Sequence, residues 1–179
     1  MTEDNIRTRL LGVTSLATEY CAICENAREM EKYEFIDRML DALPRIYLEF
    51  HDISADDMVI LEEWDYQPDY VDEDYYESIR RHIEAVMGPD DIFLETFEED
   101  MKYSETPIAA SISESLADLF QPLYNFISVV KDSEGDKLVE AYINCKEDFI
   151  SYWSQTLCNV LRALNNVRYS SSAENDSSL

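Results

Sequence analysis

The sequence predicts an all-α protein: a single-domain bundle of about six helices, two of them bent at Pro44 and Pro122. Three observations lead to this fold class. Apolar residues recur at alternating steps of four and three, which is the period of an amphipathic helix. The 179-residue chain contains only three glycines and five prolines, whereas an all-β fold needs many turns that use them. A hydrophobic content of 46% over this length is sufficient for one buried core.

Apolar stripes predict the first two helices. The first stripe covers residues 5–28 and predicts one uninterrupted helix. The second covers residues 36–50 and contains Pro44, which lacks the amide that would donate to the carbonyl group of Leu40. A bend is therefore expected at this proline. The alternative is that the segment divides into two shorter helices at Ala42.

The middle of the chain is predicted to form a long loop followed by two helices. Residues 54–74 show no sustained helical period, and we interpret them as a loop anchored by aromatic side chains. A third stripe begins at Tyr76 and is followed by Gly88. It predicts a helix that ends there, because glycine is common immediately after a helix. A short fourth helix is expected over residues 90–101, where two aspartates suit its N-terminus.

Two long helices are predicted in the C-terminal half. Ser111 and Glu114 match a capping box at the start of the fifth helix, and Pro122 predicts a bend within it. The sixth stripe covers residues 138–167 but shifts by one position at Trp153. We attribute this shift to the gradual drift of a straight helix relative to a seven-residue repeat.

The remaining features set the expected domain limits and location. The helical domain is expected to span residues 1–169, and the serine-rich residues 170–179 predict a disordered tail. The formal net charge of −25 repels phosphate, so we expect neither nucleic acid nor an anionic membrane surface as a partner. No apolar run is long enough to span a membrane and no secretory signal is visible. We therefore expect a cytoplasmic protein, with its oligomeric state left open.

The acidity is concentrated in one segment. Residues 49–100 contain 19 Asp and Glu residues against two basic residues, Arg80 and Arg81. The segment also holds several aromatic residues, which supply contact area, while carboxylates steer charged partners. We therefore expect a non-enzymatic interaction module that binds a basic protein. The candidate partner-binding residues are Trp64, Tyr66, Asp69, Asp72, Glu73 and Asp74. Two alternatives are a solvated acidic face whose aromatics pack inward, and a mimic of nucleic acid.

A divalent-metal enzyme is the alternative function. Glu31 and Glu34 are three residues apart near the start of the second helix, and Glu95 and Glu98 could supply a second set of carboxylates. Helical nucleotide pyrophosphohydrolases and di-metal bundles hold their ions with such groups. However, such spacings arise often by chance among 39 acidic residues, and the sequence contains no Glu-x-x-His motif. We therefore expect no cofactor and assign no catalytic residue.

The four cysteines are expected to be reduced core residues. Cys24 and Cys145 both fall on apolar stripes, and unpaired cysteine is among the most buried residue types. The alternatives are a zinc site that joins them to Cys21 and Cys158, or a redox pair formed by Cys21 and Cys24.

Three segments carry a resemblance to a known family. They are Met-Leu-Asp-Ala-Leu-Pro-Arg-Ile-Tyr-Leu over residues 39–48, Ser-Glu-Ser-Leu-Ala-Asp-Leu-Phe over residues 113–120, and Tyr152-Trp153 followed by Leu-Arg-Ala-Leu over residues 161–164. In this order they resemble a bacterial family catalogued as a domain of unknown function, number 5063. The resemblance spans roughly residues 5–168. It implies a compact helical fold and carries no activity or catalytic residues with it.

Asp118 lies within the second of these segments. It is two residues from Leu116, a member of the apolar stripe, and its neighbours Ala117 and Leu119 are apolar. We expect its carboxylate to face a neighbouring helix and to pair there with an Arg or Tyr side chain. A helix–helix hydrogen bond is favoured over a catalytic role.

Overall fold

The structure, a computed structural model, describes residues 3–54, 68–95 and 108–175. These residues form long helices and one small antiparallel sheet, which confirms the all-α class. The helices are α1 (Glu3–Glu25), α2 (Lys32–Asp52), α3 (Glu73–Met87), α4 (Ile112–Asp132), α5 (Leu138–Asp148) and α6 (Ser154–Asn175). The strands are β1 (Ile92–Leu94) and β2 (Ala109–Ser111). Short 3-10 turns, η1 (Ala27–Glu29) and η3 (Gly88–Asp91), follow α1 and α3.

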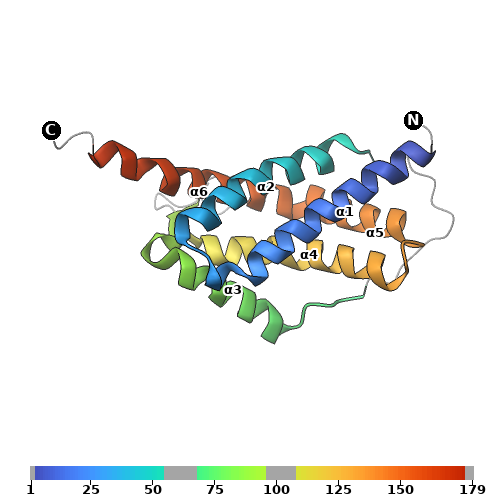
Figure 1. The fold of residues 1–179 in the computed structure, drawn as a ribbon, viewed down its shortest axis with the longest axis horizontal. Helices are drawn as coiled ribbons and strands as arrows, with labels where there is room; N and C mark the ends of the chain where they lie inside the picture. Colours follow the sequence, from blue (N-terminus) through green and yellow to red (C-terminus); the bar gives the residue numbers. More distant parts are fainter. Residues whose placement is uncertain (1–2, 55–67, 96–107, 176–179) are drawn as a thin grey trace.

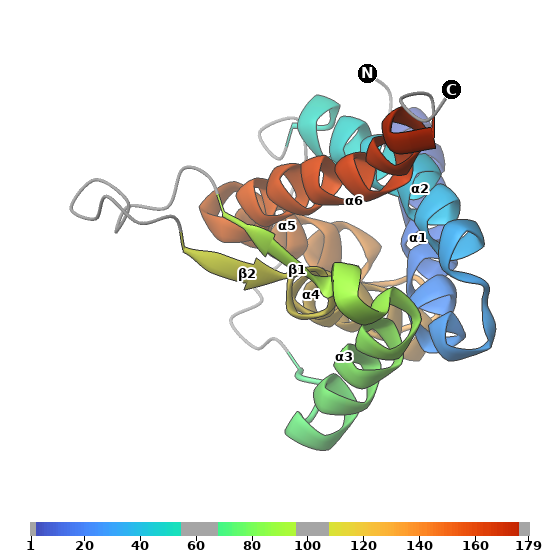
Figure 2. The same ribbon diagram turned by 90° about the vertical axis from the view of Figure 1, so that its left-hand side faces the viewer.

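Helix α4 is the centre of the bundle. It packs against α1, α3, α5 and α6, and the end-on view of Figure 2 shows it enclosed by its neighbours. Its sequence explains this position, because apolar residues occupy most of its circumference and only a buried helix can use all of them. The other long helices run side by side with it along the molecule (Figure 1).

Large aromatic side chains fill the core, and their polar atoms bond to backbone carbonyl groups. The hydroxyl of Tyr20 donates to the carbonyl of Leu116 at 2.7 Å, and that of Tyr142 donates to the carbonyl of Ile53 at 3.0 Å. Lys146 is also buried, and its ammonium group donates to the carbonyl of Phe50 at the end of α2. Such bonds offset the desolvation of buried polar atoms and fix how the helices lie against each other.

The short helix expected over residues 90–101 is not observed in the described part of this segment, so that prediction was wrong. The described part of this segment forms η3 and then β1, which pairs with β2 so that Ile92 lies opposite Ser111. The two aspartates do not stabilise a new helix here. Asp91 instead accepts hydrogen bonds from the backbone amide and hydroxyl of Ser113, at 2.7 Å each, at the start of α4. Asp90 forms an ion pair with Lys32.

The single helix expected over residues 138–167 is interrupted by a π-helical turn, η5 (Phe149–Trp153). The amide of Ser154 donates to the carbonyl of Phe149, five residues earlier. A π turn holds one residue more than an α turn, so the one-position shift in the apolar stripe has a local cause and is not gradual drift. The shift keeps both Phe149 and Trp153 buried.

Several helix boundaries agree with the sequence. Gly88 has a φ of +57° directly after α3, and the hydroxyl of Ser111 accepts from the amide of Glu114 at the start of α4. Helix α2 continues through Pro44 instead of dividing at Ala42.

Helix α6 ends at Asn175, beyond the domain boundary expected at residue 169.

The predicted number of helices is slightly too high. Helices α5 and α6 join through η5 into one continuous helix. The helix expected over residues 90–101 is absent from the described part of that segment. When α5 and α6 are counted as one, the described residues form five long helices around one core.

Candidate functional site

A polar pocket lies between α4, η5 and α6, next to strand β2 and to Glu95, which follows β1. Its volume is about 450 Å³. We refer to it as the α4–α6 pocket. Carboxylate, hydroxyl and amide groups dominate its lining, and no Lys, Arg or His is among the described residues that form it. A hollow with convergent polar groups is the usual form of a binding site.

Three carboxylates line this pocket. Glu114 and Asp118 lie one turn apart on α4, and Glu95, directly after β1, is 8% exposed. The hydroxyl of Tyr76, on α3, donates to Oδ1 of Asp118 at 2.7 Å. This pair confirms the helix–helix contact expected for Asp118.

The environment of Asp118 raises the pKa of its carboxyl group. Burial raises the pKa of this carboxyl above its usual value, the hydrogen bond from Tyr76 lowers it in part, and the charge of Glu114 raises it again. A carboxyl group with a raised pKa in a cleft is a candidate for a functional group.

Two neutral polar side chains in the lining are almost fully buried. Ser115 is 8% exposed and Asn159 is 5% exposed. The amide of Gln155 donates to Oδ1 of Asn159 at 3.2 Å. Among the residues that the structure describes, neither the Ser115 hydroxyl nor the Asn159 side-chain nitrogen has a hydrogen-bond partner. Their remaining capacity for hydrogen bonds is therefore available to a ligand or to water.

Both long helices that form the pocket depart from regular α-helical bonding beside it. Ser151 and Tyr152, in the π turn, line the pocket on one side. On the other side, Pro122 lacks the amide that would donate to the carbonyl of Asp118. Such departures from ideal geometry are frequent at functional sites.

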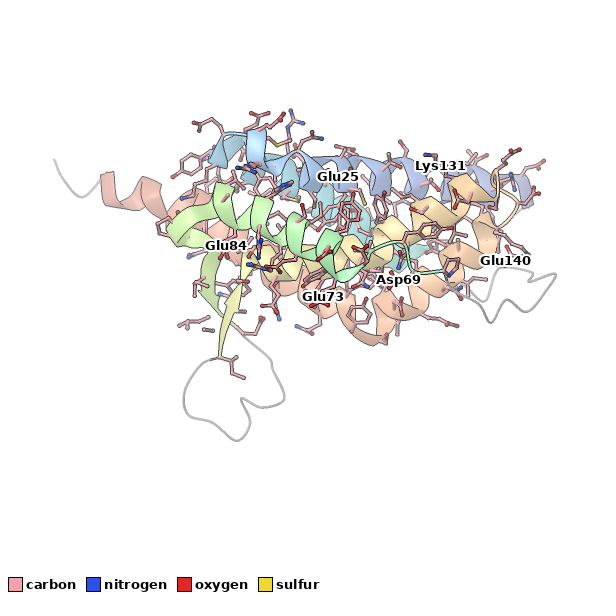
Figure 3. The ribbon with its side chains drawn as sticks, turned by 90° about the horizontal axis from the view of Figure 1, so that it is seen from below. Glu25, Asp69, Glu73, Glu84, Lys131 and Glu140 are labelled. Atoms are coloured by element: carbon pink, nitrogen blue, oxygen red, sulfur yellow. The ribbon has the colours of Figure 1, made fainter. Side chains whose placement is uncertain are left out.

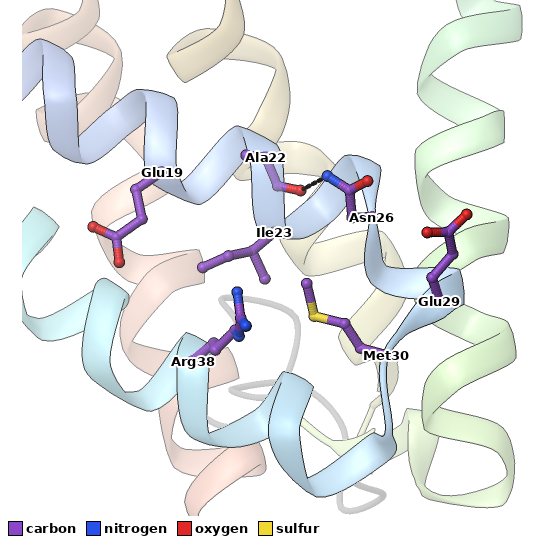
Figure 4. Close-up of a pocket in the computed structure, with 7 residues that line it drawn as sticks. All are labelled: Glu19, Ala22, Ile23, Asn26, Glu29, Met30 and Arg38. Carbon is purple, nitrogen blue, oxygen red and sulfur yellow. Dashed lines mark hydrogen bonds between the residues drawn. The ribbon is translucent and has the colours of Figure 1, made fainter.

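A second hollow, of about 540 Å³, lies between α1, η1 and α2. Figure 4 shows its lining, where Asn26 donates from its side chain to the carbonyl of Ala22. Arg38 lines the hollow and pairs with Glu34, while Glu19 pairs with Arg45. Two of its three charged side chains are thus already paired within the protein.

The predicted partner-binding carboxylates surround the N-terminus of α3, but two of them have structural roles. Asp69 accepts from the amide of Val71 at 3.1 Å and from the side chain of Asn125 at 3.3 Å. Asp72 is the N-cap of α3. Glu73 and Asp74 are exposed in the first turn, and Figure 3 shows Asp69 and Glu73 on this side of the molecule. Trp64 and Tyr66 lie outside the described residues.

The described aromatic residues of the acidic segment pack inward. Tyr75 makes edge contacts with Phe120 and Tyr124, with ring centroids 5.5 and 5.3 Å apart. Tyr70 donates to Asp132 at 2.7 Å, and Tyr76 is bonded to Asp118. In the described part of the segment, the exposed chemistry is therefore that of carboxylates rather than of aromatic rings.

The carboxylates proposed for a metal site do not form one in the described chain. Glu31 and Glu34 are exposed, Glu34 pairs with Arg38, and Glu95 lines the α4–α6 pocket. No group of three His, Cys, Asp or Glu side chains among the described residues could hold a metal ion. Glu98 lies outside the described residues.

The cysteines are mostly core residues, as expected. Cys21, Cys24 and Cys145 are buried, whereas Cys158 is exposed. Burial raises the pKa of the Cys24 thiol to about 12, so this thiol stays protonated at neutral pH. Zinc and redox chemistry both require the thiolate form, which this environment disfavours.

Most of the α4–α6 pocket was not predictable from the sequence. Two signals in the sequence belong to it: the one-position shift of the stripe at Trp153, and the polar Asn159 between Cys158 and Val160. Neither signal shows that the two helices face each other. That relation depends on the tertiary packing of α4 against α6.

Fold and pocket together define an acidic helical bundle with a polar pocket. The chain belongs to the family described as domain of unknown function DUF5063, whose model matches residues 6–170. It is also similar to protein BF1032 from Bacteroides fragilis, whose crystal structure matches with a TM-score of 0.77 and 29% sequence identity. This match covers 90% of the present chain and 93% of the other.

Other comparisons add little. No curated protein matches the chain. None of the described helices is both long enough and apolar enough to cross a membrane.

Proposed function

We propose that this protein is a non-enzymatic interaction module that binds a basic protein through an acidic surface on α3. One observation carries the proposal. Residues 68–95 contain nine Asp and Glu residues against Arg80 and Arg81. Both arginines are already paired, because Arg80 bonds to Glu77 and Glu84, and Arg81 bonds to Glu77. Asp91 and Glu95 are buried and Asp90 pairs with Lys32, so the negative potential comes from the exposed acids around the start of α3, which are Asp69, Asp72, Glu73 and Asp74.

This potential favours a cationic partner. Opposite charges speed the diffusional encounter of two proteins and orient them before contact. Glu73 and Asp74 are carriers of this charge without a structural role as a cap, and both are exposed in the first turn of α3. Figure 3 shows Glu73 and Glu84 along this helix. The same potential repels phosphate, so the proposed partner is a protein and not a nucleic acid.

The test measures binding of a lysine- and arginine-rich peptide to the full chain at low salt. The double variant Glu73→Gln, Asp74→Asn removes two negative charges from this surface. It should weaken binding by about threefold to tenfold, since each exposed charge contributes a modest attraction. A matched control, Asp41→Asn with Glu147→Gln, removes the same charge from exposed positions on α2 and α5. The control should retain most of the affinity.

Two results would reject this function. One is that the peptide does not bind at all. The other is that both double variants weaken binding equally, because the attraction would then come from total charge and not from the α3 surface.

A further inference from the structure

The α4–α6 pocket differs from the α3 surface in kind. It is a hollow, and buried polar side chains from separate helices converge on it. The acidic groups alone do not define a site. The additional observation is that Ser115 and Asn159, both more than nine-tenths buried, line the pocket. Among the described residues, the Ser115 hydroxyl and the Asn159 side-chain nitrogen have no partner.

The lining specifies the chemistry of a ligand. Glu114 and Asp118 offer carboxylate oxygens one helical turn apart, and the hydroxyl of Ser115 lies between them in sequence. Oδ1 of Asp118 accepts from Tyr76, which leaves Oδ2 for a further donor. The side-chain nitrogen of Asn159 can donate to a carbonyl group. The pocket therefore suits a planar cation with several N–H donors, attached to a group that carries a carbonyl.

We propose that the α4–α6 pocket binds the guanidinium group of an arginine side chain, with Asn159 donating to a backbone carbonyl of the same peptide. This inference rests on the proposed function, because it names the residue of the basic partner that is anchored. Arginine fits better than lysine, since its planar fork can donate to two carboxylates at once. The hollow between α1 and α2 offers no equivalent site, because its own Arg38 occupies the lining.

The experiment titrates the full chain with N-acetyl-arginine N-methylamide and follows backbone amide signals by NMR. Saturable shifts are expected at Ser115, Asp118 and Asn159. The citrulline analogue has the same shape without the charge and should cause none of these shifts. The lysine analogue should bind several-fold more weakly, because it cannot donate to both carboxylates in a plane.

Variants test the assignment independently of folding. Asp118→Asn should lower the affinity for the arginine probe about tenfold, the usual effect of losing one charge-assisted hydrogen bond. Glu114→Gln changes an exposed residue of the pocket lining, so it should fold normally and also weaken binding. Asp41→Asn, at an exposed position on α2, is the matched control and should leave binding of the small probe unchanged.

The outcomes separate this inference from the proposed function. If the long basic peptide binds through α3 while the arginine probe causes no shifts in the pocket, the inference is overturned and the function stands. If the probe shifts the pocket signals but the long peptide does not bind, the function fails and the pocket assignment stands. Equal shifts with the citrulline analogue would also overturn the inference.

Discussion

At the scale of single residues, buried polar groups fix the arrangement of the helices. Asp91 is 4% exposed and accepts two hydrogen bonds from Ser113, so it acts as a cap for α4 from a distant part of the chain. Asn125 plays a similar part, because its side chain accepts from the amide of Tyr70 before α3. Contacts of this kind determine where α3 and the sheet lie relative to α4.

Replacing Asp91 tests the strength of this cap. Asp91→Ala should reduce the free energy of unfolding by about 2–3 kcal/mol, because two buried donors lose a charged acceptor. Urea unfolding followed by circular dichroism measures the change. The exposed Asp41→Ala serves as the control. A loss no larger than that of the control would show that Ser113 does not depend on this carboxylate.

The raised pKa of Asp118 predicts a specific pH dependence. In the unfolded chain an aspartate titrates near pH 4, whereas folded Asp118 keeps its proton to higher pH. Within this window the native state binds more protons, so the free energy of unfolding falls as pH rises through it. Asp118→Asn should remove this fall and retain an acceptor for Tyr76.

The measurement compares wild type and Asp118→Asn at several pH values from about 3 upward. The stability of the variant relative to wild type should rise as pH increases through the window. Tyr76, Glu114 and Tyr152 interact electrostatically with Asp118 and are unchanged in this comparison. A relative stability that does not change with pH would contradict the raised pKa.

Local residue patterns were predictable where the partners are close in sequence. The Ser111 cap is an example, since its donor is only three residues away. Asp118 was also expected to meet an Arg or Tyr across a helix interface, as it does. The role of Asp91 was not predictable, because an acid before an apolar run looks the same whether it caps its own segment or another one.

At the scale of elements, the π turn is the most informative irregularity. It lets Phe149 and Trp153 both face the core, and the indole nitrogen of Trp153 donates to the carbonyl of Cys145 at 3.2 Å. It also presents Ser151 and Tyr152 to the α4–α6 pocket. The sequence showed the shift in the stripe, but periodicity alone does not distinguish a local insertion from gradual drift.

Deleting one exposed residue of the turn tests this account. Removal of Ile150, which is 67% exposed, should restore regular α-helical bonding while both apolar stripes stay on one face. The free energy of unfolding should change by less than about 1 kcal/mol. Trp153→Ala is the contrast, with an expected loss of about 3–5 kcal/mol from the core. Unfolding of the deletion variant at room temperature would refute the insertion model.

The small sheet shows the limit of element prediction. Ile92, Phe93 and Leu94 form a short apolar run, and such runs do not distinguish a strand from a helix. The partner strand lies at Ala109–Ser111, so the pairing depends on a contact that crosses the intervening residues. The long helices were predictable because each repeats its apolar period over several turns.

At the scale of the whole molecule, charge sets the physical behaviour. A net charge of −25 on a small bundle creates self-repulsion that opposes the compact state. Salt screens repulsion between exposed charges, with a Debye length of about 10 Å at 0.1 M. The surface ion pairs, such as Arg9 with Glu49, are partly exposed and offset little of this repulsion.

The melting temperature should therefore rise with salt. Between about 20 mM and 500 mM sodium chloride we expect an increase of several degrees, because screening removes repulsion faster than it weakens the few ion pairs. Differential scanning fluorimetry measures it, with potassium chloride as a check for specific ion effects. A melting temperature that falls with either salt would show that attractive pairs dominate the surface.

The role proposed for the carboxylates of α3 and of the α4–α6 pocket is to recruit a cationic partner. Its most direct test is a calorimetric titration of the full chain with an arginine-rich peptide at increasing salt. We expect the affinity for this peptide to fall by at least about tenfold from about 50 mM to about 300 mM sodium chloride, because salt screens the attraction between exposed charges. An affinity that stays constant over this range, or a peptide of reversed charge that binds equally well, would contradict it.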